Sequence, residues 1–137
     1  MRIIALIFIT VFAIRWETVS LSSSEAAQAT DDPLGRLFEA IEAVESGGDS
    51  NAVGADGEAG PYQIRPIFVD DANKIVGKRA FSYGDRFSKE KSKEMMRIYW
   101  RFYATERRLG RLPTFEDLAR IHNGGPNGYK KESTKGY

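Results

Sequence analysis

Residues 33–48 read PLGRLFEAIEAVESGG, and this stretch decides the fold class. Its apolar side chains recur at the spacing of one helix face: Leu34, Leu37, Phe38, Ile41 and Val44. Asp32 can cap the first turn, and Pro33 suits the first helical position. The glycine pair that begins at Gly47 stops the helix. We therefore predict a helix from Pro33 to Glu45, with Glu45 at its C-terminal end beside the apolar face.

The remaining chain is also helical in pattern. Glycines and short polar residues dominate residues 47–60, which predicts a loop or a short hairpin after the first helix. Apolar spacing predicts further helices over residues 67–77, 91–108 and 114–122. An alternating strand pattern is limited to residues 59–64. The predicted fold class is mainly α, in a single domain.

Composition excludes several classes of protein. A chain of 137 residues allows one domain of ordinary size. Its formal charge of +1 argues against a nucleic-acid-binding protein. The absence of cysteine removes disulfides and zinc–thiolate sites, and a single histidine rules out a multi-histidine metal site within one chain. We therefore expect neither a metal nor an organic cofactor, and a monomer that binds no nucleic acid.

The N-terminal segment has the pattern of an export signal. A basic start at Arg2 is followed by an uncharged apolar run from Ile3 to Ile14. This run is too short to span a bilayer, which needs about 20 residues, and it fits a secretory signal. We predict a signal and linker at residues 1–29, a folded domain at residues 30–137, no stable membrane span, and a secreted or periplasmic location.

Glu45 is the strongest candidate for chemistry. A carboxyl that acts as a general acid near neutral pH needs a raised pKa, which apolar neighbours supply. The C-terminal end of a helix acts in the same direction because it disfavours negative charge. A lone Glu at a helix end is also commonly an ordinary surface residue. The neighbouring motifs must therefore distinguish a catalytic Glu45 from a surface one.

Three motifs accompany this residue. The triplet ESG at residues 45–47 is followed by GPYQI at residues 60–64 and by ARIHNGGPNG at residues 119–128. Together they resemble the invertebrate-type lysozyme and destabilase family, over residues 36–137. More distantly, they resemble the soluble lytic transglycosylases. The resemblance implies a lysozyme-like (α+β) fold in which Glu45 is the catalytic acid.

The resemblance also implies a function. It predicts a secreted, bacteriolytic and antimicrobial glycosidase that cleaves the β-1,4 bond between N-acetylmuramic acid and N-acetylglucosamine. The implied partner is peptidoglycan or a chitin-like polysaccharide, and Glu45 protonates the leaving oxygen. The implied substrate-binding residues are Ser46, Tyr62, Gln63, Tyr99, His122 and Asn123.

One departure from the family pattern affects the mechanism. The family has an Asp before a Val-Gly pair, whereas here Ala52 precedes Val53. A retaining glycosidase needs a second carboxylate about 5–5.5 Å from the first, and Asp56 is the best substitute in this loop. Without it, a lytic transglycosylase that uses Glu45 alone is the alternative.

Two other kinds of protein remain open. One is a catalytically inactive module that binds the cell wall. The other is a protein-directed enzyme or an inhibitor-like interaction protein. Destabilases are credited with isopeptidase activity that uses a Lys near GPYQI, but this chain has Arg65 there. Because Arg stays charged and cannot act as a base, isopeptidase activity is not expected.

Overall fold

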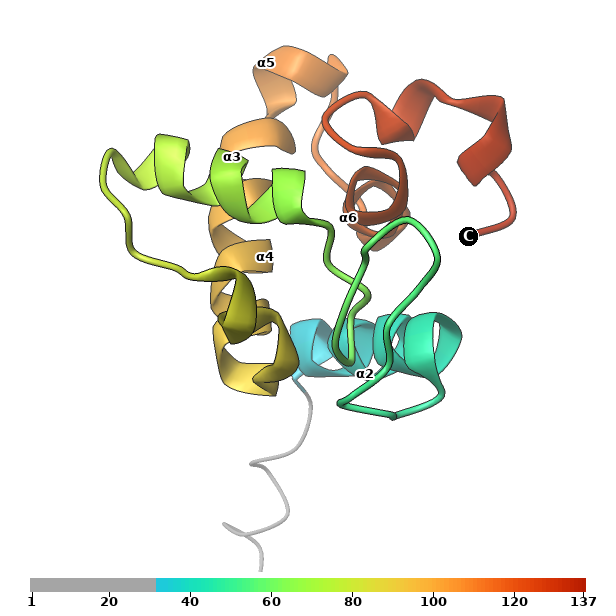
Figure 1. Cartoon of the computed structure of the whole chain (residues 1–137). Coiled ribbons are helices and arrows are strands. Elements are labelled where there is room, and N and C mark those ends of the chain that lie inside the picture. Colours follow the sequence, from blue (N-terminus) through green and yellow to red (C-terminus); the bar gives the residue numbers. More distant parts are fainter. Residues whose placement is uncertain (1–31) are drawn as a thin grey trace, which may run out of the picture. The chain divides into compact units, whose positions relative to one another are not determined.

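Helices make up most of the part of the chain that the computed structural model describes, residues 32–137 (Figure 1). The predicted signal and linker at residues 1–29 lie outside the described residues. The elements are α2 (Pro33–Ser46), α3 (Pro66–Val76), the 3-10 turn η1 (Tyr83–Phe87), α4 (Lys89–Tyr103), α5 (Glu106–Leu109), α6 (Phe115–Gly124), and the 3-10 turns η2 (Gly128–Lys130) and η3 (Glu132–Thr134). The prediction of a mainly α protein is confirmed. No helix among residues 32–137 is long and apolar enough to cross a membrane.

The first helix forms as its sequence predicts. The Asp32 side chain accepts a hydrogen bond from the backbone N–H of Leu34 at 3.1 Å and so caps α2. Gly47 ends the helix with φ 62°, a left-handed conformation that glycine adopts without a Cβ clash. Phe38 and Ile41 are buried on the inner face. Both ends of α2 therefore follow from local sequence.

The predicted helix over residues 91–108 is wrong in its bounds. The structure has two helices there, α4 and the short α5, because Ala104 leaves the helical conformation with ψ 66° and Thr105 is extended. The break was not predicted because no glycine or proline lies between Tyr103 and Gly110. Side-chain spacing alone therefore did not reveal the bend.

The core lies around α4, which packs against both α3 and α6. Phe38 of α2 stacks on Trp100 of α4 with ring centroids 5.3 Å apart. The indole N–H of Trp100 donates to the backbone carbonyl of Leu118 at 2.9 Å, which ties α4 to α6. Fully burying each such side chain contributes about 1.5–3 kcal/mol. The buried apolar set is Phe38, Ile41, Tyr62, Ile64, Phe68, Val69, Ala72, Phe81, Met95, Met96, Tyr99, Trp100, Ala119 and Ile121.

A capping box formed by Thr114 and Asp117 fixes the start of α6. The Thr114 hydroxyl accepts from the Asp117 N–H at 3.3 Å, and the Asp117 carboxylate accepts from the Thr114 N–H at 2.8 Å. Arg111 adds two hydrogen bonds to the same carboxylate, at 2.6 and 2.9 Å. Burial alone would raise the pKa of Asp117, but the hydrogen bonds from Arg111 and Thr114 outweigh it and lower that pKa.

The glycine-rich segment after α2 folds as a loop with two isolated β-bridges. Ala59 pairs with Val53 on one side and with Ile64 on the other. The backbone of Gly60 packs against that of Arg86, where a Cβ would lie 1.8 Å from the Arg86 carbonyl oxygen. The loop thus returns the chain to α2 before α3 begins, and Figure 1 shows it in green in front of α2.

Gly128 offers a test of this packing. A Cβ at Gly128 would lie 1.8 Å from the carbonyl oxygen of Arg120, whereas a Cβ at Gly136 would meet no atom within 4 Å. We expect Gly128→Ala to lower the free energy of unfolding by at least about 2 kcal/mol, because the turn after α6 must move off the helix. Gly136→Ala should change it by no more than about 0.5 kcal/mol. Urea unfolding followed by circular dichroism measures both; equal effects would contradict the close approach.

Candidate functional site

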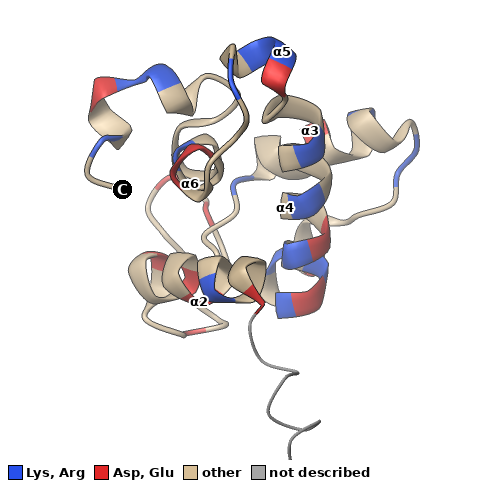
Figure 2. Cartoon of the chain, turned by 180° about the vertical axis from the view of Figure 1, so that it is seen from behind, with Lys and Arg blue, Asp and Glu red and all other residues tan. Residues whose placement is uncertain are grey.

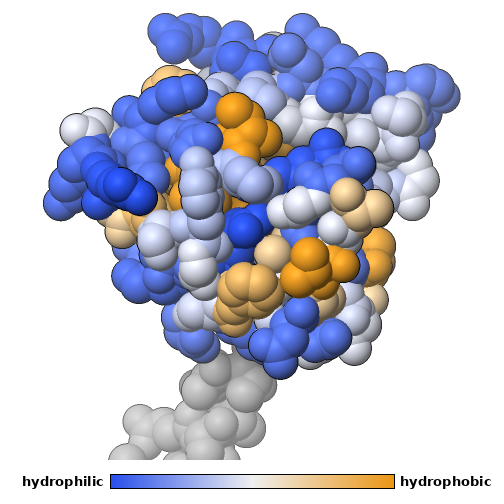
Figure 3. Space-filling model, viewed as in Figure 1, coloured by the Kyte–Doolittle hydropathy of each residue, from blue (hydrophilic) through white to orange (hydrophobic). Residues whose placement is uncertain are grey.

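A cleft of about 280 Å³ lies where α2 and α6 end and α3 begins. It brings together five of the predicted site residues: Glu45, Gln63, Tyr99, His122 and Asn123. The other lining residues are Glu58, Ile64, Arg65, Ile67, Phe68, Gly124, Gly125 and Lys131. On the face shown in Figure 3, hydrophobic side chains gather above and below a strip of polar ones. The site is therefore a polar cleft with apolar walls.

Glu45 lies at the end of α2 with its side chain only 16% exposed. Burial raises its pKa, and the negative charge of Glu58 acts in the same direction. Hydrogen bonds from Tyr137 and Asn123 lower the pKa and offset part of this rise. The Tyr137 hydroxyl donates to Oε1 of Glu45, so one carboxylate oxygen already has a partner within the protein.

His122 is a neutral, structural residue of the cleft floor. Its side chain is 3% exposed, and burial lowers its pKa to about 4. Its Nε2 lies 2.9 Å from the backbone carbonyl oxygen of Tyr62. Because a carbonyl can only accept, Nε2 carries the hydrogen and donates it. His122 thus holds the GPYQI turn against α6, and its Nε2 is 3.6 Å from Glu45 Oε1.

Two predicted substrate-binding residues do not line the cleft. Tyr62 is fully buried and packs edge-on against Phe38, with ring centroids 6.0 Å apart; burial raises its pKa to about 12. The Ser46 hydroxyl donates to the backbone carbonyl of Pro61 at 2.9 Å and accepts from the N–H of Gly48. Both residues join α2 to the GPYQI turn, because that turn is packed inward.

Gln63 and Tyr99 line the cleft but also hold the structure. Gln63 has φ 45°, and its amide donates to the carbonyls of Gly60 at 2.8 Å and Ala52 at 3.2 Å. These bonds fix the loop and leave the amide oxygen of Gln63 for a ligand. Tyr99 is 2% exposed and stacks on Phe68 at 3.9 Å between centroids, so it forms a wall of the cleft.

The second carboxylate that lines the cleft is Glu58, whereas the predicted Asp56 does not line it. The Asp56 side chain is 73% exposed and pairs with Arg65 at 3.3 Å on the outer side of the loop. The backbone of Gly54 lies against the Glu58 side chain, where a Cβ would be 2.4 Å from its carboxyl carbon. The missing side chain at Gly54 is the signal in the sequence that could have identified Glu58.

No cation site accompanies these carboxylates. Within residues 32–137, no three side chains of His, Asp or Glu are grouped so that they could hold a metal ion. The cations at the cleft are the side chains of Arg65 and Lys131, and Nζ of Lys131 donates to the Gly124 carbonyl at 2.6 Å. The cleft therefore combines two carboxylates with two cations from the protein itself.

The Tyr137 contact can be tested through the pKa of Glu45. Because the Tyr137 hydroxyl stabilises the ionised carboxylate, Tyr137→Phe should raise that pKa further above its ordinary value. Tyr129→Phe is the matched control, since its hydroxyl donates to the Arg108 carbonyl instead. Carboxyl NMR titration measures the pKa in each protein. An unchanged value in Tyr137→Phe would show that Tyr137 does not donate to Glu45 in solution.

The neutral state of His122 can be tested through stability. Its pKa falls from about 6.5 in an unfolded chain to about 4 in the folded one. Its contribution to stability is therefore complete above about pH 6.5 and is lost as the pH falls toward about 4. We expect the destabilisation caused by His122→Asn to be smaller by about 2.5 kcal/mol at about pH 4.5 than at about pH 8. Urea unfolding at both pH values measures this. Equal destabilisation at the two pH values would show that folding does not lower the pKa of His122.

Comparison with solved structures gives an informative match. No family model matches the chain, and no curated protein matches it significantly. A solved structure does match, at 28% sequence identity and a TM-score of 0.62, over 74% of this chain and 82% of the matched chain. It is the crystal structure of Aeromonas hydrophila PliI in complex with Meretrix lusoria lysozyme. That crystal contains two proteins: PliI, an inhibitor of lysozyme, and the lysozyme that it binds.

This comparison corrects the predicted function. With the inhibitor as the structural neighbour, the match contradicts a peptidoglycan-cleaving glycosidase, and with it the enzyme class of glycoside hydrolase or lytic transglycosylase. A bacteriolytic hydrolase is contradicted on the same ground. The family resemblance itself finds no family match and stays a prediction. The comparison does not support the predicted peptidoglycan or chitin-like partner.

Proposed function

We propose that the chain is a lysozyme-binding protein of the inhibitor kind, which acts without cleaving peptidoglycan. The observation that carries the proposal is the match to the PliI–lysozyme complex at 28% identity. A secreted or periplasmic location belongs to the same proposal, because an inhibitor must meet lysozyme outside the cytoplasm. The interaction replaces the predicted polysaccharide with a protein partner.

The state of Glu45 supports a role other than catalysis. A general acid must lie within hydrogen-bond reach of the glycosidic oxygen. Here Tyr137 donates to Oε1 of Glu45, and Asn123 donates to the same carboxylate. Both contacts use acceptor sites of the carboxylate within the protein itself. The carboxylate instead helps to fix Tyr137 beside the cleft.

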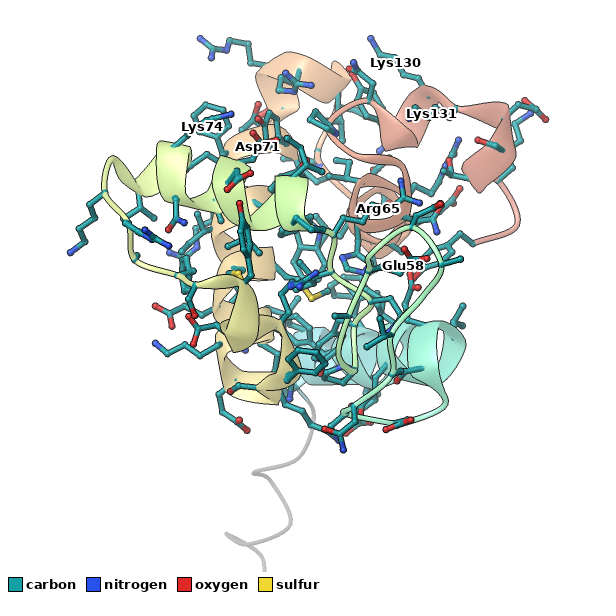
Figure 4. The ribbon with its side chains drawn as sticks, viewed as in Figure 1. Glu58, Arg65, Asp71, Lys74, Lys130 and Lys131 are labelled. Atoms are coloured by element: carbon teal, nitrogen blue, oxygen red, sulfur yellow. The ribbon has the colours of Figure 1, made fainter. Side chains whose placement is uncertain are left out.

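The cations at the cleft supply a complementary surface. A lysozyme cleft carries two carboxylates, and complementary charge speeds association and fixes its register. Arg65 is 58% exposed, and Lys131 lines the cleft close to it. Figure 4 shows Arg65 beside Glu58 over the loop. We place the lysozyme contact at this edge, with Arg65 and Lys131 facing the partner's carboxylates.

The lysozyme-like fold also belongs to the proposal. Its support is the order of elements: a helix that ends at Glu45, a glycine-rich loop, and α6 with His122 on the inner side of the cleft. In this proposal, the residues that resemble a glycosidase site stabilise the surface that binds the protein partner.

Two measurements on the full chain test the function. The lytic rate of Meretrix lusoria lysozyme on a bacterial cell-wall suspension should fall as the chain is added, and calorimetry should show a saturable complex. The chain alone should release no muropeptides from purified peptidoglycan. Release of muropeptides that is lost in Glu45→Gln would overturn the proposal and would place the chain with the enzyme of that crystal instead.

Charge reversal tests where the partner binds. Lys131→Glu should weaken lysozyme binding by about tenfold, because a carboxylate would then face the carboxylates of the partner. Lys135→Glu makes the same change in charge at an exposed position that pairs with Glu132 away from the cleft, and should have little effect. Equal weakening by both variants would contradict the placement of the interface at the cleft.

A further inference from the structure

A second hollow lies apart from the cleft, between α3, the loop that follows it, and η1. Its volume is about 650 Å³, and it shares no lining residue with the cleft. This volume lies in the range of about 300–1,000 Å³ that small-molecule sites have, and it exceeds what one phosphate ion fills. Figure 1 shows the loop arching away from α3 before it returns to η1. The hollow is therefore large enough for an organic ligand.

The wall of this hollow is fixed by Asn73. The Oδ1 of Asn73 accepts from the N–H groups of Ala80 at 2.8 Å and Phe81 at 2.9 Å, and its Nδ2 donates to the Phe81 carbonyl at 2.9 Å. Gly77 ends α3 with φ 77° and turns the chain into the loop. Because one side chain makes three hydrogen bonds to the loop, the loop keeps its shape without a ligand.

Cations line one end of the hollow. Lys78 and Arg79 are exposed, and no carboxylate among residues 32–137 pairs with either. Lys74 also lines the hollow, although its Nζ lies 3.4 Å from Asp71. Arg79 lines the same hollow as Tyr83. Figure 2 shows the loop after α3 in blue, and Figure 4 shows Lys74 above Asp71.

The other end of the hollow carries an acidic and aromatic pair. The Tyr83 hydroxyl donates to Oδ1 of Asp70 at 3.0 Å, and Tyr83 is 49% exposed. The carboxylate of Asp70 can accept hydrogen bonds from the hydroxyls of a ligand, and the exposed Tyr83 ring offers an apolar face for a sugar ring. A bare anion would be repelled by Asp70. The ligand therefore needs an anionic part and a hydroxyl-bearing part.

We infer that this hollow binds a phosphorylated sugar. Arg79 and Lys78 hold the phosphate, since a guanidinium can make two parallel hydrogen bonds to phosphate oxygens. Asp70 and Tyr83 hold the sugar. A free sugar phosphate and a glycan polymer that carries phosphodiesters both contain a phosphate next to a sugar. The experiment below distinguishes these two sources of the ligand.

The test uses the full chain, labelled with ¹⁵N, and glucose 6-phosphate as the probe. Saturable shifts should be confined to the amides of residues 70–83. Glucose alone and inorganic phosphate alone should each bind at least about tenfold more weakly, since each lacks one half of the contacts. A phosphate-bearing teichoic acid that binds more tightly than glucose 6-phosphate would identify a polymer as the source, and weaker binding would identify the free sugar phosphate.

Matched variants complete the test. Arg79→Gln should weaken glucose 6-phosphate binding by about tenfold, the loss of one charge-assisted contact. Arg107→Gln removes an equal charge from the exposed surface of α5 and should leave the affinity unchanged. Equal binding of inorganic phosphate and glucose 6-phosphate, equal effects of the two variants, or shifts outside residues 70–83 would each overturn the inference.

Discussion

The hydrogen bond from His122 to the carbonyl of Tyr62 joins the two halves of this domain. It crosses 60 positions of sequence in a fully buried setting, at 2.9 Å. On one side, the GPYQI turn is tied to α2 through Ser46, and on the other, α6 is tied to α4 through Trp100. The cleft forms on the surface of this junction. Because the histidine must stay neutral to remain there, the same contact makes the junction sensitive to acid.

The cleft gives Glu45 the environment of a reactive carboxyl, but the protein itself already supplies hydrogen-bond donors to that carboxylate. Glu45 is desolvated and lies near the charge of Glu58, which is the environment that raises the pKa of a carboxyl. Tyr137 and Asn123 nevertheless donate to it. A perturbed pKa arises from structural networks as well as from catalysis. The proposed function uses this cleft as a surface that binds a protein, and not as one that cleaves a glycan.

Much of the fold could be predicted from local patterns, and less of the site. Asp32 and the Thr114–Asp117 box set the starts of α2 and α6 through hydrogen bonds between near neighbours, and Gly47 ends α2 through its left-handed conformation. The break after Tyr103 was missed because the sequence has no glycine or proline before Gly110. Tyr62 was predicted to face a ligand and is instead buried, since a turn's side chains have no periodicity that separates inside from outside.

The sequence by itself determined the helical class, the two ends of α2 and the position of Glu45 at the end of that helix, because these depend on residues a few positions apart. Only the tertiary structure decided which carboxylate shares the cleft with Glu45. Asp56 and Glu58 are two residues apart in one loop, and the bridges at Ala59 turn Glu58 inward and leave Asp56 with Arg65. Tyr137 lies 92 positions from Glu45, and folding alone brings its hydroxyl to that carboxylate.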